Sequence, residues 1–475
     1  MSTLFAALTT AGNALDVVEQ AMGVVQNNVA NASTPGYVTQ TLSVSADSFD
    51  PSGQLWGGVT ASGTQSARDI YAEQAVWSAN QQVGAATQES TSLQSLQSIF
   101  NISGTAGIPG ALTNLISAFS AWATAPTDST ARQQVITAAQ GLTQSFNAAS
   151  SGVQQLSSQT DQQLQSTVSQ INQLAKQIAN LNGEIRNGGK SDAGANTQLY
   201  NDLEQLSGLA PISVEMESDG TATVTIAGQT PLVMGQSAEA LQLSYAQPAG
   251  ATIPGASPHA VIQSSNGTDV TALVTSGRLS GLLQFRNSVV PSVIGDGTEQ
   301  GGLNQLAQAV ADTVNGLLTA GQDPAGAAGT ALFAYNGSAP TAVASTLSLN
   351  ATATAANLAA IEPGPPAVSN GVANQLAQLG KTALTALGGS TSTAFYSSLA
   401  SNIGSLASSA STAQQSETSA LTRAQNLRSQ LSGVSLNEQA ANLMQFQETY
   451  QASAEAISRI GSTIQYLLTT MQQLQ

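Results

Sequence analysis

The stretch "NNVANASTPGYV", residues 27–38, closes a segment with helical spacing and contains no charged residue. Asn and Ser side chains compete with backbone hydrogen bonds, so they favour caps and turns over helix interiors. Pro35 cannot continue a helix and restricts Thr34 to extended geometry, whereas Gly36 permits a positive φ. The stretch therefore predicts an abrupt end to an N-terminal helix, with a defined exit direction.

The segment before this stop has apolar residues spaced alternately four and three apart, which is the seam of a coiled coil. Its seam residues are Leu4, Leu8, Ala11, Leu15, Val18, Met22, Val25 and Val29. The C-terminal segment repeats the spacing at Leu436, Gln439, Leu443, Phe446, Tyr450, Ser453, Ile457, Ile460, Ile464, Leu467, Met471 and Leu474. Chain termini are usually loose ends. Two such seams predict that the terminal helices pack on each other or on neighbouring copies; the alternative is two amphipathic helices docked on a globular core.

Two further seams predict long helices in the interior of the chain. One runs from 153 to 185 and meets the breaker "NGG" at 187–189; the other runs from 399 to 431 and meets Gly433. Weaker helical patterns cover residues 70–100 and 130–150.

The middle of the chain changes to a period of two, which is typical of strands. "ISVEMESDGTATVTIAG" alternates on both sides of Asp219-Gly220 and predicts a hairpin, and "AVIQSSNGTDVTALV" repeats the pattern around Asn266-Gly267. Residues 321–395 are rich in Gly, Ala, Thr and Pro and predict a β-rich or loop-rich region.

The fold class predicted is mainly α with a β-containing insert. We expect an elongated molecule with paired N- and C-terminal coiled-coil helices, a long helical bundle, a β-hairpin region and a small outer β/loop region. The expected domains are residues 1–45 with 436–475 for the terminal coiled coil, 46–325 with 396–435 for the long-helix bundle with β-hairpins, and 326–395 for the outer region.

The composition excludes several classes of function. The 475 residues include 11 basic and 27 acidic ones, so the net charge is -16 and no basic footprint for nucleic acid exists. An anionic membrane surface would repel the chain, and no apolar run approaches the roughly 20 residues of a membrane span, so we expect no membrane insertion. Charged residues make up only 8%. We therefore expect amide and hydroxyl groups, rather than surface ion pairs, to organise the polar surface.

The chain has no cysteine, which excludes disulfides, thiolate metal sites and Cys nucleophiles and is compatible with export. The first basic residue is Arg68, so no positive region precedes an apolar core as in a secretory signal. We expect a protein that is either cytoplasmic or exported without a cleaved signal.

No constellation of residues indicates catalysis. The single histidine, His259, is expected to be a solvated loop residue, because a lone His is seldom a ligand or a base. The carboxylate pairs Asp202/Glu204 and Glu215/Glu217 are expected to be solvated as well. We predict no enzyme activity, no catalytic residue, no metal site and no cofactor.

The opening stretch resembles the N-terminal signature of the bacterial flagellar axial proteins, which include the rod, hook and hook-associated families. The matching positions are Asn27, Asn28, Ala30, Asn31, Thr34, Gly36 and Tyr37, and Pro35 favours a hook-associated protein over the hook protein. "SLNEQAANLMQFQETYQASAEAISRI" resembles the C-terminal half of the family pattern. It matches at Leu436, Glu438, Ala441, Asn442, Leu443, Gln447, Tyr450, Gln451, Ala452, Ala454 and Ile457.

Internal stretches resemble the hook-associated protein 1 family, the proteins of the hook–filament junction. They are "SGRLSGLLQFRNSVVP" at 276–291, "LYNDLEQLSGLAPISV" before the first hairpin, and "LNQLAQAVADTVNGLLTAGQD" before Phe333. Two features depart from the family. No basic residue follows "TPGY", and the large outer domains expected after Phe333 are reduced.

The resemblance implies a structural adaptor between hook and filament, exported through the flagellar type III system and required for filament assembly. It implies an extracellular location in the flagellum, self-association in a ring, contacts with hook protein and the second hook-associated protein, and an export chaperone. The alternatives are hook protein or another axial protein, and, remotely, an enzyme domain in the middle of an axial protein.

The residues expected at the assembly interface lie on the two terminal seams. They are Leu4, Leu8, Leu15, Val18, Met22, Val25, Val29, Leu443, Phe446, Tyr450, Ile457, Ile460, Ile464 and Leu467. The residues expected to carry the family motif are Asn27, Asn28, Asn31, Thr34, Pro35, Gly36, Tyr37, Asn442 and Gln451.

Overall fold

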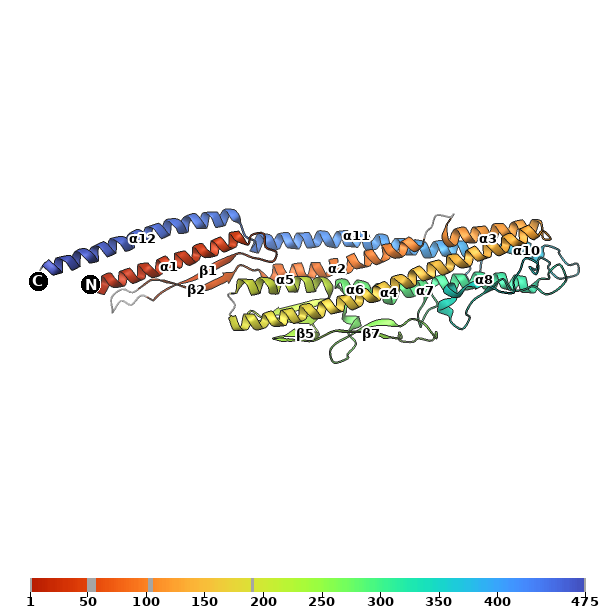
Figure 1. The fold of residues 1–475 in the computed structure, drawn as a ribbon, viewed down its shortest axis with the longest axis horizontal. Helices are drawn as coiled ribbons and strands as arrows, with labels where there is room; N and C mark the ends of the chain where they lie inside the picture. Colours follow the sequence, from red (N-terminus) through yellow and green to blue (C-terminus); the bar gives the residue numbers. More distant parts are fainter. Residues whose placement is uncertain (1, 49–56, 101–105, 189–191, 474–475) are drawn as a thin grey trace.

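The structure is a computed structural model that describes residues 2–48, 57–100, 106–188 and 192–473. The chain forms a long rod with both termini at one end, as Figure 1 shows. The helices are α1 Ser2–Ala30, α2 Ile70–Ile99, α3 Gly107–Thr124, α4 Ser129–Gly188, α5 Ala193–Leu209, α6 Gly277–Gln284, α7 Val290–Ile294, α8 Gly302–Ala320, α9 Val343–Thr346, α10 Gly371–Ala377, α11 Ser392–Ser432 and α12 Leu436–Gln473. The predicted fold class is confirmed.

Helix α4 is the spine of the bundle. Its 60 residues contain no proline, so nothing interrupts the hydrogen-bond ladder over about 90 Å. The two separate helical patterns expected at 130–150 and 153–185 are thus parts of one helix. The N-terminal half of α4 lies in one hydrophobic core with α3 and α8, and its C-terminal half lies in a second core with α5 and α6.

The outer region is not a separate hydrophobic unit. Leu332, Val343, Leu358 and Leu376 lie in the same core as α3, α8 and the start of α4. The division at 326–395 stays a proposal, and the apolar side chains of this segment pack on the helices of the bundle.

The β-structure is a set of small antiparallel sheets, one of which, β1–β2, lies against α1. The strands are β1 Gln40–Ala46, β2 Val59–Ser66, β3 Ile212–Met216, β4 Ala222–Ile226, β5 Thr230–Met234, β6 Ser237–Ala238, β7 Gln242–Ala246, β8 His259–Gln263, β9 Phe333–Ala334 and β10 Ser348–Leu349. Strands β3 and β4 pair from Ile212↔Ile226 to Met216↔Ala222, which confirms the hairpin at Asp219-Gly220.

The second predicted hairpin is much shorter than expected. Strand β8 pairs along its length with β7, and it meets the residues after Asn266-Gly267 only at its end, where the Val270 amide donates to the Ile262 carbonyl. That turn closes only an isolated bridge between Gln263 and Asp269, because the chain then enters a 3-10 turn at 271–273.

Helices α1 and α12, which we call the terminal pair, run antiparallel along each other, and the β1–β2 hairpin lies against α1 (Figure 1). The expected domain boundary at residue 45 falls inside β1, whose residues pair with β2 from Gln40↔Ser66 to Ala46↔Val59. A boundary there would divide a hydrogen-bonded hairpin, so we propose that the terminal unit runs to residue 66.

Candidate assembly interface

The seam between α1 and α12 contains most of the residues expected at the interface. Val18, Val25 and Ile464 are buried, and a further eight are half-buried: Leu4, Leu8, Leu15, Met22, Leu443, Phe446, Ile457 and Ile460. Val29, Tyr450 and Leu467 are exposed instead. Two helices alone can bury one stripe of each partner, which explains why few of these side chains reach full burial.

The terminal pair also exposes large apolar side chains outside this seam. Phe5, Met444 and Tyr466 are 52%, 61% and 72% exposed. Leu468 and Met471, close to the end of α12, are exposed as well. Helix α12 has 38 residues against 29 in α1, so its last turns extend past the start of α1 (Figure 1). Exposed apolar side chains of this size, on a helix pair that no other described element covers on that side, are candidates for contacts with other proteins.

An apolar groove of about 300 Å³ lies between the terminal pair and the hairpin. Its walls include Val24 from α1, Val44 from β1 and Phe446 from α12. Asn442, one of the expected motif residues, lines its polar side together with Gln439. Gln451, the other C-terminal motif residue, is exposed on α12.

The motif residue Asn28 fastens the end of α1 to both the hairpin and α12. Its side chain is 1% exposed. Its Nδ2 donates to the Gln40 carbonyl at 2.8 Å and to Gln439 Oε1 at 3.0 Å, and its Oδ1 accepts from the Gln40 amide and the Tyr37 hydroxyl. Burial raises the pKa of Tyr37. All the hydrogen-bonding groups of this buried amide have partners, as burial demands.

The remaining asparagines of the motif end the helix locally. Asn31 Nδ2 donates to the Asn27 carbonyl and to Asn27 Oδ1, and the Thr34 hydroxyl donates to Asn31 Oδ1. These bonds compete with continued helix, which is the physical basis of the predicted stop.

The Pro35-Gly36 turn rests on helix α5 of the bundle. Gly36 has φ +74°, and a Cβ at this position would lie 1.9 Å from Asn201 Oδ1. Asn201 Nδ2 donates to the Pro35 carbonyl at 3.1 Å, and Arg68 Nη2 donates to the Gly36 carbonyl at 2.7 Å. Glycine is therefore required twice, for its φ and for the close approach of α5.

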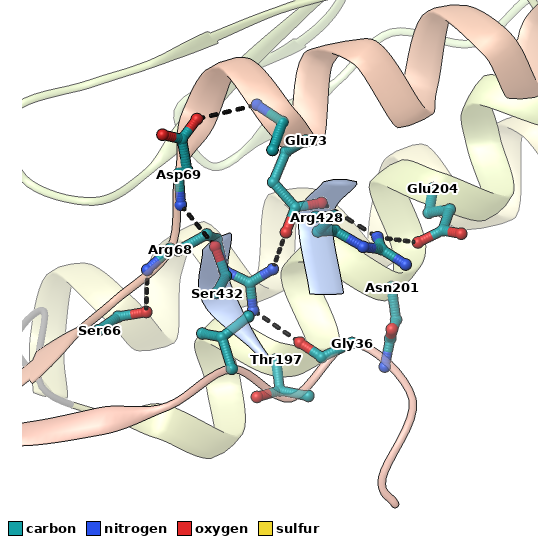
Figure 2. Close-up of polar contacts among 12 residues, drawn as sticks. Gly36, Ser66, Arg68, Asp69, Glu73, Thr197, Asn201, Glu204, Arg428 and Ser432 are labelled. Atoms are coloured by element: carbon teal, nitrogen blue, oxygen red, sulfur yellow. Dashed lines mark hydrogen bonds and ion pairs between the residues drawn. The ribbon is translucent and has the colours of Figure 1, made fainter. Parts of the chain in front are cut away.

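Beneath this turn lies a cluster of four charged residues, Arg68, Glu73, Glu204 and Arg428, which we call the joint cluster (Figure 2). Glu73 is fully buried; one carboxylate oxygen pairs with Arg68 and the other with Arg428 Nη1 at 3.1 Å. Arg428 Nη1 also contacts Glu204 Oε2 at 2.6 Å. The Arg68 guanidinium lies 3.8 Å from the centre of the Tyr200 ring.

The electrostatics of the two arginines differ. Burial lowers the pKa of Arg68, although Glu73 acts in the opposite direction. At Arg428 burial also acts to lower the pKa, but Glu204 and Glu73 outweigh it and raise the pKa above the ordinary value. Burial raises the pKa of the adjacent Tyr200.

Sequence reasoning missed the joint cluster. Arg428 and Glu73 are 355 positions apart, and no local pattern links them. The only signal in the sequence was the small number of basic residues. In a chain with 11 of them, Arg68, directly before the helical pattern at 70–100, could have been examined as a candidate for a buried pair.

Three groups expected to be solvated are not: His259, Asp202, and Glu204, whose carboxylate pairs with Arg428 in the joint cluster. His259 is the first residue of β8, not a loop residue, and its Nε2 lies 2.7 Å from Asp296 Oδ2. Asp202 is 2% exposed because α5 packs against α4 there, and this burial raises the pKa of Asp202.

Within the described ranges, no group of three or more His, Cys, Asp and Glu side chains could hold a metal ion. None of the helices that the structure describes is long and apolar enough to cross a membrane.

The structure is an elongated, mainly helical rod in which the two signature stretches meet through Asn28 and Gln439, where the terminal pair joins the bundle. This arrangement agrees with the flagellar axial class that the two stretches resemble. Comparison with protein families narrows the assignment. The family described as "Flagellar hook-associated protein FlgK helical domain" matches residues 93–333, about half of the chain. The chain belongs to that family.

Individual relatives agree with the family. Flagellar hook-associated protein 1 of Salmonella typhimurium is 27% identical over 332 residues, which cover 67% of this chain and 57% of that protein. The match thus spans little more than half of the Salmonella protein's length. Flagellar hook-associated protein 1 of Bacillus subtilis is 25% identical, and the match covers 96% of both chains.

A solved structure shares the fold. The flagellar hook junction protein FlgK from Burkholderia pseudomallei superimposes with a TM-score of 0.66 at 18% identity. The superposition covers 76% of this chain and 100% of the solved one.

Proposed function

We propose that this protein is a structural component of the bacterial flagellum that forms the junction between hook and filament. The observation that carries the proposal is the terminal pair of a chain in the hook-associated family. Phe5, Met444 and Tyr466 are large apolar side chains for which the described part of the chain offers no burial. Large exposed apolar side chains on one helix pair support a surface that other subunits cover in the assembly.

The partners follow from this role. The terminal pair packs against neighbouring copies in a ring, with hook protein on one side and the second hook-associated protein on the other. The chain reaches the outside of the cell through the flagellar type III system, accompanied by an export chaperone. A cysteine-free chain supports this route, because no disulfide would have to be broken before export and remade afterwards.

The role is structural and not catalytic. The pair of His259 and Asp296 holds strand β8 to the loop after α7, since Asp296 also accepts hydrogen bonds from the amides of Thr298 and Glu299. These bonds commit the Asp296 carboxylate to the loop, which supports a structural use of the histidine.

Deletion of the gene and complementation test the proposal. We expect cells without the protein to build hooks but no filaments and to lose filament protein to the medium, and the full-length chain to restore filaments. Leu443→Asp should fail to restore them, because it places a charge on the half-buried seam of α12. Gln445→Asp adds the same charge at an exposed position of the same helix and serves as the matched control.

The outcomes separate the candidate functions. Loss of the hook itself in the deletion strain would move the assignment to hook protein or another axial protein. Normal filaments in the deletion strain would contradict any axial role. Restoration of filaments by Leu443→Asp would show that the seam is not needed for assembly.

A further inference from the structure

The cleft between helices α4 and α5 is a feature of the bundle that the junction role leaves unexplained. Figure 1 shows the two helices side by side. The cleft has a volume of about 500 Å³, and one face of each helix lines it. The lining residues are Gln170, Gln173, Leu174 and Gln177 from α4, and Gln198, Asp202, Gln205 and Leu209 from α5. The terminal pair contributes none of them.

Five glutamines and one carboxylate give this cleft its polar character. All five glutamines are exposed, whereas Asp202 is buried. The described part of the chain places no lysine or arginine in the lining. The cleft therefore offers amide groups and one acidic group, with no positive charge of its own.

The Asp202 carboxylate lacks the partners that other buried carboxylates have. Within the described ranges, the buried acidic side chains are Glu73, Asp202 and Asp296. Glu73 pairs with two arginines, and Asp296 pairs with His259 and accepts from two backbone amides. Asp202 Oδ1 accepts one hydrogen bond, from Gln198 Nε2 at 2.7 Å, and its Oδ2 is buried with no partner among the described residues.

Protonation does not satisfy this carboxyl group. A charged Oδ2 needs a donor, and a protonated Oδ2 needs an acceptor for its hydroxyl hydrogen. The described residues supply neither. Asp202 therefore lowers the stability of the free chain in either state, because a buried polar atom without a partner costs free energy. A buried, incompletely paired acid in a cleft is the kind of group that a ligand completes.

The lining selects a cationic ligand with several N–H donors. The Asp202 carboxylate repels an anion, and an apolar ligand would find only Leu174 and Leu209 to cover it. A guanidinium group carries five N–H donors in a fixed plane and pairs with a carboxylate through two of them. It also gives up its water more readily than an ammonium group does. The amide oxygens of the glutamines can accept its remaining donors.

We infer that the α4–α5 cleft binds an arginine side chain of a partner protein, whose guanidinium pairs with Asp202 and donates to the surrounding glutamines. Gln198 is exposed, so its side chain can turn away and open the carboxylate to the ligand. Because α4 and α5 belong to the bundle, this contact is separate from any contact of the terminal pair.

Nuclear magnetic resonance of the full chain, labelled with ¹⁵N at glutamine, tests the inference. The probe is the tripeptide Ac-Ala-Arg-Ala-NH₂, and the control peptide carries citrulline, which has nearly the same shape without the charge. In titrations into the millimolar range, the arginine peptide should shift the side-chain amide signals of Gln198 and Gln205. The signal of Gln133, at the far end of α4, should stay in place. The citrulline peptide should shift none of the three.

Two variants separate the carboxylate from general charge. Asp202→Asn keeps the shape and removes the charge, so it should weaken binding of the arginine peptide about tenfold or more. Glu215→Gln removes one charge at an exposed position of β3 and should bind like the parent chain. Unfolding would not explain a loss in Asp202→Asn, because relief of the unpaired buried charge should make that variant the more stable one at pH 7.

Three results would overturn the inference. One is an arginine peptide that shifts the cleft signals no more than the citrulline peptide does. Another is undiminished binding in Asp202→Asn. The third is a response of the same signals to calcium chloride and not to the arginine peptide, which would make the cleft a metal site with oxygen ligands. Since the titration involves neither hook nor filament, its outcome is independent of the proposed junction role.

Discussion

Replacing Gly36 with alanine tests the account of the motif turn most sharply. The change places a Cβ at a residue with φ +74° and only 1.9 Å from Asn201 Oδ1. The left-handed conformation costs a residue with a Cβ about 1–2 kcal/mol. The Asn201 side chain must also turn away and give up its hydrogen bond to the Pro35 carbonyl, which costs about 0.5–1.5 kcal/mol more. We expect Gly36→Ala to lower the free energy of unfolding by roughly 1.5–3.5 kcal/mol.

Urea unfolding followed by circular dichroism measures this change, and Gly267→Ala is the control. Gly267 has φ +81°, and none of the described atoms outside its neighbours lies within 4 Å of an added Cβ there. Gly267→Ala should therefore show the conformational cost alone, about 1–2 kcal/mol. In an Asn201→Ala background, the cost of Gly36→Ala should fall to the control value. Equal costs for the two glycine variants in the parent chain would refute the contact with Asn201 as the second reason for glycine.

Three further predictions concern charged groups. Glu73→Ala should lower the free energy of unfolding by about 3–5 kcal/mol, because it leaves buried arginines unpaired, whereas Arg186→Ala should cost under about 1 kcal/mol; urea titrations of both variants measure the difference. Asp202→Asn should raise the free energy of unfolding at pH 7 but not at pH 3. Burial raises the pKa of Asp202 in the folded chain, so the folded chain loses stability as the pH rises through that pKa and the carboxyl becomes charged. Melting temperatures of the variant and the parent at the two pH values test the sign. For Asp296 the pH dependence of stability has the opposite sign. Burial acts to raise the pKa of Asp296, but hydrogen bonds from Thr298, Glu299 and His259 outweigh burial and lower it, so its charged form adds stability above the ordinary pKa of 3.8 and loses that effect as the pH falls through the lowered pKa. Asp296→Asn should remove this part of the dependence of melting temperature on pH, and an unchanged slope below pH 4 would contradict the prediction.

The sequence alone determined the elements that depend on neighbours along the chain. The heptad spacing of the two ends, the stop at Asn31 to Gly36 and the Asp219-Gly220 hairpin follow from helical period, proline geometry and turn chemistry, all of which act over a few residues. The same local reasoning was incomplete at Asn266-Gly267. There the turn forms and closes a short bridge, but the strand that pairs along the whole of β8 is β7, which comes before it in the chain.

Only the tertiary structure decided how these elements meet. The seams could have joined either each other or neighbouring copies, and the structure places α1 on α12 and fastens them through Asn28 and Gln439, which are 411 positions apart. The low content of charged residues predicted that surface ion pairs would not organise the polar surface. The ion pairs that Glu73 makes with Arg68 and Arg428 are buried instead. Glu73 and Arg428 are brought together because α2 and α11 pack along each other at the joint, and a buried charge must find its partner in space, wherever that partner lies in the sequence.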